Sequence, residues 1–172
     1  MLQFSYRIEV YEMTYHNIPP VFDENSKILV LGSFPSVKSR ETQFFYGHPQ
    51  NRFWKVISTV VDCDCPITVE EKKKFLLDNN IALWDVIKAC EIEGSSDSSV
   101  KHVIPNDLSK IIKNSNVTKI FTNGNLSYSL YNKICFERTG IPAIKLPSTS
   151  PANAAWSLEK LTDEWKRLIL TV

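Results

Sequence analysis

The sequence predicts an α/β fold: a three-layer α/β/α sandwich with a central four-stranded parallel sheet. Short apolar runs alternate with longer segments of helical periodicity, which is the pattern of β-α-β units. Right-handed crossovers between such strands put their carboxyl ends, and the loops that follow, on one edge of the sheet. The 172 residues suit a single domain, in which residues 1–26 form an extended N-terminal arm.

Each predicted strand is a short run rich in aliphatic and β-branched residues, and the four runs are Lys27–Leu31, Ile81–Trp84, Thr118–Thr122 and Ala143–Leu146. Segments with apolar residues at helical spacing separate these strands, and they are Arg52–Val61, Val69–Asn79, a short one near Asp107–Lys113, and Leu126–Glu137. A last amphipathic helix is predicted from about Ala154 to Leu170, with one apolar stripe of Leu158, Leu161, Trp165, Leu168 and Ile169.

Composition limits the possible partners. Twenty basic and nineteen acidic residues give a net charge of +1, so any contacts with nucleic-acid phosphates must be few and local. No apolar run approaches the roughly 20 residues that span a bilayer. Charged residues interrupt Met1–Glu12, which therefore does not resemble a signal peptide. We expect an intracellular protein without a membrane partner.

The four cysteines predict neither a metal site nor a redox motif. Cys63 and Cys65 form a C-x-C pair rather than the C-x-x-C of zinc ribbons, and Cys90 and Cys135 stand alone. Reduced, mostly buried thiols are therefore favoured over metal ligands. No organic cofactor is indicated either.

The most informative segment follows the first predicted strand. Gly32-Ser33-Phe34-Pro35-Ser36 is typical of a tight exposed loop, either an ordinary turn or a cradle for a phosphate. It lacks the lysine of a P-loop and the later glycines of a dinucleotide fingerprint. Phe45–Trp54 then combines four aromatic residues with His48, Asn51 and Arg52. Aromatic, amide and cationic groups together suit a flat, hydrogen-bonding ligand such as a nucleobase.

Asn51 is the strongest candidate for chemistry. An amide can accept a hydrogen bond from water and donate one to a base or sugar, so it can position a nucleophile without a charge. The alternative is a helix N-cap before Arg52–Val61, and the residues alone leave the two roles about equal. For His48 the alternatives are a general acid and a histidine bonded to neighbouring backbone.

Three other loops should meet at the same edge of the sheet. Pro147–Asn153 carries three hydroxyl residues, which either bind a phosphate at the start of the last helix or merely cap that helix. Asp85 either accepts from a base or caps a helix, and the serines near Asp97 either contact the DNA backbone or form a flexible loop. Asn123 adds an amide at the rim of the pocket.

Together these segments resemble the uracil-DNA glycosylase superfamily, most closely its hypoxanthine-DNA glycosylase branch, often called family 6. The matching pieces occur in consistent order between residues 28 and 154, and they are Gly32–Ser36, Tyr46–Trp54, Ala82–Val86, Gly94–Ser98, Asn123-Gly124 and Leu146–Ala154. Phe34 stands where many relatives have a water-activating Asp or Asn, and the hypoxanthine branch is thought to use the Asn that falls at Asn51. Pro147–Asn153 matches the loop that grips DNA beside the lesion, with Ser-Thr-Ser-Pro in place of His-Pro-Ser.

The resemblance implies a monofunctional DNA glycosylase that hydrolyses the N-glycosidic bond of a flipped, deaminated base, with deoxyinosine favoured. Asn51 would be catalytic, and the base pocket would be lined by Gly32, Ser33, Phe34, Tyr46, His48, Phe53, Trp84, Asp85 and Asn123. The residues that would contact damaged DNA are Ser36, Lys38, Arg52, Ser95, Ser98, Ser148, Thr149, Ser150 and Asn153. We expect a monomer without metal or cofactor. The alternatives are a uracil- or mismatch-specific glycosylase, a nucleotide- or nucleoside-binding α/β protein, and a catalytically silent DNA-binding homologue.

Overall fold

Seven strands form two sheets in the computed structural model, which describes residues 12–170. In chain order the elements are β1 (Thr14–Tyr15), β2 (Ile28–Gly32), α1 (Val37–Thr42), α2 (Phe53–Val60), α3 (Val69–Asp78), β3 (Ile81–Asp85), β4 (Ile87–Glu91), a 3-10 helix (Asp97–Ser99), β5 (Lys101–Pro105), α4 (Ser109–Ile112), β6 (Lys119–Asn123), α5 (Asn125–Leu130), a π-helical turn (Tyr131–Cys135), α6 (Phe136–Thr139), β7 (Ala143–Leu146), α7 (Leu158–Trp165) and α8 (Arg167–Leu170).

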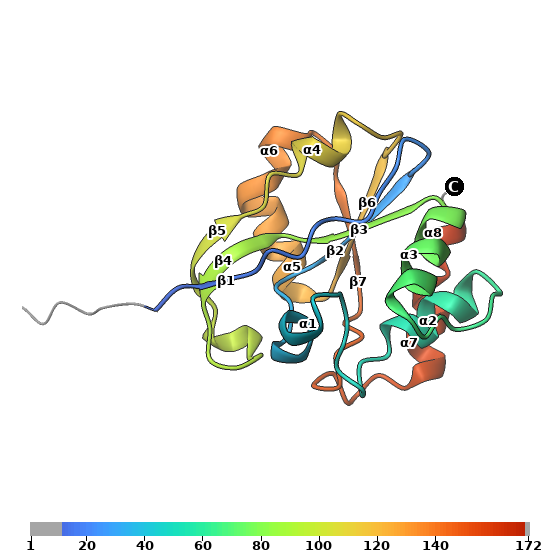
Figure 1. The fold of residues 1–172 in the computed structure, drawn as a ribbon, viewed down its shortest axis with the longest axis horizontal. Coiled ribbons are helices and arrows are strands. Elements are labelled where there is room, and N and C mark those ends of the chain that lie inside the picture. The colour runs from blue at the N-terminus through green and yellow to red at the C-terminus, as the bar shows by residue number, and fades with distance from the viewer. Residues whose placement is uncertain (1–11, 171–172) are drawn as a thin grey trace, which may run out of the picture.

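The central sheet is parallel and has the strand order β3-β2-β6-β7. Every residue of β2 and β3 is buried, as expected for strands covered on both faces. Figure 1 shows α2, α3, α7 and α8 on one side of this sheet and α4, α5 and α6 on the other. The predicted three-layer sandwich around four parallel strands is therefore confirmed.

A second, antiparallel sheet with the order β1-β4-β5 corrects the sequence interpretation. The segment Asp85–Pro105, expected to be a loop, forms the hairpin of β4 and β5. Register shifts beside Ala89 break the alternation of apolar and polar residues by which a strand is recognised. The edge strand β1 comes from the expected N-terminal arm, whose residues 1–11 lie outside the described part.

Two helices also differ from expectation. Helix α1 lies within the segment predicted as a loop, and the Ser36 side chain caps it by accepting a hydrogen bond from the Ser39 amide. The last helix begins at Leu158 rather than Ala154, because Ser157 is its N-cap, and it is interrupted at Lys166 between α7 and α8. The central residues of the predicted stripe (Leu161, Trp165 and Leu168) are fully buried, whereas Leu158 and Ile169 are exposed.

The apolar face of α2 packs against α7 and forms much of the core on that side of the sheet. This packing fixes the start of α2, and therefore the preceding Asn51-Arg52, relative to the sheet. Within residues 12–170, no helix is long and apolar enough to cross a membrane.

Candidate active site

The carboxyl ends of the parallel strands bring the predicted loops together. Gly32 at the end of β2 pairs with Asp85 at the end of β3, and Asn123 at the end of β6 pairs with Leu146 at the end of β7. The loop 147–153 then passes beside the start of α2, where the Arg52 amide donates to the Thr149 carbonyl over 3.1 Å. Segments far apart in the sequence thus share one edge of the sheet, where α/β proteins bind their ligands.

A chain of hydrogen bonds links three of these loops. The Asn123 Nδ2 donates to the Thr149 Oγ1 over 2.9 Å, and the Thr149 hydroxyl donates to the Asn51 Oδ1 over 3.0 Å. The Thr149 amide donates back to the Asn123 Oδ1 over 3.0 Å, and the Phe53 amide donates to the Asn51 Oδ1 over 2.9 Å. Asn51 thus satisfies the first amide of α2 and is also joined to the opposite loop, but the N-cap position of this helix is Arg52 rather than Asn51.

Arg52 holds the loop 147–153 rather than facing solvent. Its guanidinium donates to the backbone carbonyls of four residues of this loop and its continuation, Thr149, Ser150, Asn153 and Trp156. A guanidinium with its donors used in this way has little left for a phosphate. Arg52 therefore shapes the loop 147–153, and this use of its donors argues against the predicted contact with DNA.

Two stacked aromatic rings stand beside Asn51. The Tyr46 and Phe53 rings are nearly parallel, at an interplanar angle of 20° and a centroid separation of 4.0 Å. Phe53 is fully buried and stacks against Tyr46, so it supports the Tyr46 ring, which argues against its predicted place in the lining of the pocket. Tyr46 is half-buried as a residue, so its ring is the candidate platform for a flat ligand.

The hydroxyl group of Tyr46 is enclosed together with the carboxyl group of Asp85. The Asp85 Oδ2 is buried without a hydrogen-bond partner among the described residues. The Tyr46 hydroxyl is also buried; it meets no partner at full hydrogen-bond geometry, but the Asn123 side chain is near enough to lower its pKa against the larger effect of burial. Burial raises the pKa of Asp85 to about 7 and also raises the pKa of Tyr46, to which the nearby Asp85 contributes. Buried titratable groups with shifted pKa values cluster at functional sites, so both are retained as candidate pocket residues.

The comparisons with known proteins agree with this geometry. Residues 19–170 match the Uracil DNA glycosylase superfamily. The chain belongs to this superfamily. It is 34% identical over 155 residues to a hypoxanthine DNA glycosylase of Methanosarcina acetivorans, which covers 90% of this chain and 97% of that protein. A protein of the same name from Methanosarcina barkeri is 40% identical over 90 residues, covering 52% of this chain and 57% of that one.

A solved structure supports the same assignment. The solution NMR structure of a candidate uracil DNA glycosylase from Methanosarcina acetivorans has a TM-score of 0.75 and 33% identity, covering 91% of this chain and 99% of that one. The superfamily predicted from the motifs is therefore confirmed.

Three of the predicted pocket residues in this superfamily member point elsewhere or are used locally. Trp84 is buried and donates its indole N–H to the Ile18 carbonyl, so it lies under the N-terminal segment, which argues against its predicted place in the pocket. The half-buried Phe34 packs edge-on against His16. The exposed His48 accepts from the Gln50 amide at 3.2 Å, which is its backbone-bonded alternative.

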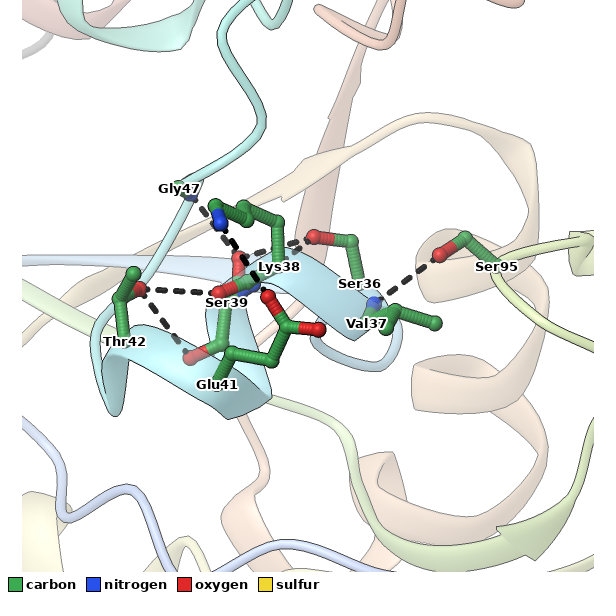
Figure 2. Close-up of polar contacts among 8 residues, drawn as sticks. All are labelled: Ser36, Val37, Lys38, Ser39, Glu41, Thr42, Gly47 and Ser95. Carbon is green, nitrogen blue, oxygen red and sulfur yellow. Dashed lines mark hydrogen bonds and ion pairs between the residues drawn. The ribbon is translucent and has the colours of Figure 1, made fainter.

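The β4–β5 loop of this superfamily member docks on α1 and the loop before it. Figure 2 shows Ser95 accepting a hydrogen bond from the Val37 amide, at 3.0 Å. Nearby, the Ser33 hydroxyl lies 3.4 Å from the Asp97 Oδ1. Sequence reasoning did not select Asp97 as a site residue, although its position among serines was a signal. Burial raises the pKa of Asp97.

The remaining predicted DNA contacts lie on two rims of this edge. Ser36, Lys38, Ser95 and Ser98 stand on α1 and the β4–β5 loop, where Lys38 is exposed and forms an ion pair with Glu41. Ser148, Ser150 and Asn153 are half-buried on the loop after β7. These polar side chains stay predicted contacts with the DNA backbone.

The loop 147–153 has its own internal bonds and does not begin a helix. The Ser148 hydroxyl accepts from the Ser150 amide, and the Asn153 side chain donates to the Ser148 carbonyl. Because Ser157 caps α7, neither a phosphate site at that helix start nor a capping role applies to these serines. Thr149 is fully buried and its hydroxyl is bonded to Asn51, which argues against the predicted contact between Thr149 and DNA.

Proposed function

We propose that this protein is a monofunctional DNA glycosylase that releases hypoxanthine from deoxyinosine in DNA. One observation carries the proposal: the relative named hypoxanthine DNA glycosylase is covered over 97% of its length at 34% identity. Since one chain supplies all the residues described above, we propose that it acts as a monomer. Because its substrate would be cellular DNA, we further propose that it acts inside the cell.

The site supports extrusion of a single base. A deaminated base pairs poorly, so removing it from the duplex costs less than removing a normal base. The extruded base would stack on the Tyr46 ring, next to the enclosed carboxyl of Asp85. Hydroxyl groups on the two rims would hold the flanking phosphates, in keeping with the nearly neutral net charge.

The reaction is hydrolysis at C1′ of the sugar. The bond between C1′ and N9 breaks, its electron pair leaves with the base, and the sugar becomes an oxocarbenium-like cation that backbone phosphates and site dipoles stabilise. Asn51 would hold the water whose oxygen forms the new bond to C1′, while a water proton is transferred to the departing base. No lysine is among the pocket residues described above, and the rim residue Lys38 is paired with Glu41, which supports a product that is an intact abasic site rather than a cleaved strand.

The test is base release under single-turnover conditions from labelled duplexes that carry one deoxyinosine, uracil or xanthine. Alkali then cleaves the strand wherever an abasic site has formed. We expect release from deoxyinosine and loss of activity by orders of magnitude in Asn51→Ala. Asn114→Ala is the matched control, since Asn114 is exposed and its side chain donates to the Lys110 carbonyl.

Other outcomes would identify the alternatives. Release from uracil alone would keep the reaction and overturn the substrate. Duplex binding without any release would indicate a catalytically silent DNA-binding homologue. Binding of a free nucleoside, without binding of duplex DNA, would indicate a nucleotide- or nucleoside-binding protein.

A further inference from the structure

We infer that Thr149 is a positioning residue that fixes the Asn51 amide so that its NH2 group, not its carbonyl oxygen, faces the reacting atoms. The inference rests on the proposed function. It changes the expected part played by Asn51, because a group that only donates cannot take a proton from water.

Two backbone amides fix which group donates in each hydrogen bond that links Asn123, Thr149 and Asn51. A backbone N–H can only donate, so the Phe53 amide identifies the oxygen of Asn51, and the Thr149 amide identifies the oxygen of Asn123. The remaining Asn123 nitrogen therefore donates to the Thr149 Oγ1. Thr149 has one hydroxyl proton, and it is left to donate to the Asn51 Oδ1.

This direction leaves Asn51 with only its nitrogen available. Both lone pairs of its Oδ1 are occupied, by the Phe53 amide and the Thr149 hydroxyl. The Nδ2 makes no hydrogen bond to the described residues. It can hold a water molecule by donating to one lone pair of the water oxygen, while the other lone pair forms the bond to C1′.

Thr149 itself is held firmly. Its side chain is fully buried, so solvent does not compete for its hydroxyl. Its carbonyl accepts both the backbone amide of Arg52 and the Arg52 Nε. The hydroxyl therefore occupies one position between the two asparagines.

The test compares Thr149→Val, which keeps the shape and removes the hydroxyl, with Thr149→Ser, which keeps the hydroxyl. We expect single-turnover base release to fall tenfold or more in Thr149→Val with unchanged affinity for duplex DNA, and to stay within threefold of wild type in Thr149→Ser. In an Asn51→Ala background, Thr149→Val should cause no further loss, because Thr149 acts through Asn51. A rate within threefold of wild type in Thr149→Val would overturn the inference. It would also be overturned if Thr149→Val reduced the rate by the same factor in the Asn51→Ala background as in wild type.

A second variant tests the donor role even if Thr149→Val does not fold. Asn51→Asp keeps the oxygen that Phe53 and Thr149 contact and replaces the NH2 group by an acceptor. We expect base release as low as in Asn51→Ala, whereas a rate near that of wild type would show that Asn51 accepts.

Failure of the proposed function is seen separately, as a wild type that does not act on deoxyinosine. In that case NMR couplings of the Asn51 side chain in the free protein still test whether Thr149 holds that side chain in one conformation. We expect one χ1 rotamer in wild type and averaging in Thr149→Val. Averaging in wild type would overturn the inference.

Discussion

The Asp85 Oδ1 lies only 2.4 Å from the point that a Cβ atom on Gly32 would occupy. The two residues are direct partners in the ladder between β2 and β3, so neither backbone can move without disturbing the sheet. The same point is 3.1 Å from the Tyr46 hydroxyl. The absence of a side chain at Gly32 is therefore what allows a carboxyl and a phenol to be enclosed beneath the candidate pocket.

Gly32→Ala should destabilise the protein and lower base release. The added methyl group would push the enclosed Asp85 carboxyl, and overpacking of this kind costs about 1–3 kcal/mol. Urea unfolding would measure the loss. Gly140→Ala is the control: its methyl enters open space, but its φ of +67° still imposes strain of about 1–2 kcal/mol on an L-residue. Full base-release activity in Gly32→Ala would contradict the proposed place of Asp85 in the pocket.

Asp85→Asn should make the free energy of unfolding less sensitive to rising pH. Burial raises the pKa of Asp85 from 3.8 in the unfolded chain to about 7 in the folded protein, with the Tyr46 hydroxyl as a neighbouring titratable group. The folded state therefore holds a proton that the unfolded state loses, so the free energy of unfolding falls as pH rises from about 4 to 7 and is level above that. Between pH 5 and pH 8, wild type should lose roughly 3 kcal/mol relative to the variant.

Urea unfolding of both proteins at the two pH values measures this difference. The variant is its own control for all other titrating groups, because they are common to both proteins. Parallel pH profiles for the two proteins would show that Asp85 titrates normally.

The sandwich was predictable because its four parallel strands are uninterrupted apolar runs between amphipathic helices. The hairpin of β4 and β5 was not, since bulges beside Ala89 break the alternation that marks a strand. In the site, too, features with a local sequence pattern were predictable and contacts between distant residues were not. The sequence predicts Asn51 and Asn123 as amides on loops that converge, but the hydrogen bond from Thr149 to Asn51 spans 98 positions and has no signature in sequence. The charge of Arg52 predicts a phosphate contact, because the sequence does not show the backbone carbonyls that the guanidinium meets once the loop is folded.

The thiols should divide into two classes. Cys63 and Cys65 are exposed, whereas Cys90 and Cys135 are buried, and burial raises the pKa of each buried thiol to about 11. Since the thiolate is the reactive form, a thiol reagent at pH 8 should titrate two groups rapidly in the native protein and four after denaturation. Rapid titration of all four in the native protein would show that the β4 and Cys135 regions open readily.

Arg52→Gln should weaken the fold without changing the salt dependence of DNA binding. The guanidinium donates to the carbonyls of four residues in the loop that carries Thr149, so its loss should cost about 2–3 kcal/mol and lower base release. A residue that does not neutralise a phosphate releases no counterion, so the slope of log affinity against log salt should match that of wild type. Fluorescence titration of a labelled duplex over a range of salt concentrations measures the slope.

Lys38→Gln is the matched comparison for Arg52. Lys38 is exposed on the α1 rim, and its surface ion pair with Glu41 contributes little to stability. Its replacement should leave urea unfolding almost unchanged and reduce the salt slope by about one if the ammonium group meets a phosphate. A slope reduced in Arg52→Gln and unchanged in Lys38→Gln would reverse the two roles. The guanidinium would then exchange its carbonyl partners for a phosphate when DNA binds, and the loop that positions Thr149 would be set by the substrate rather than by the fold.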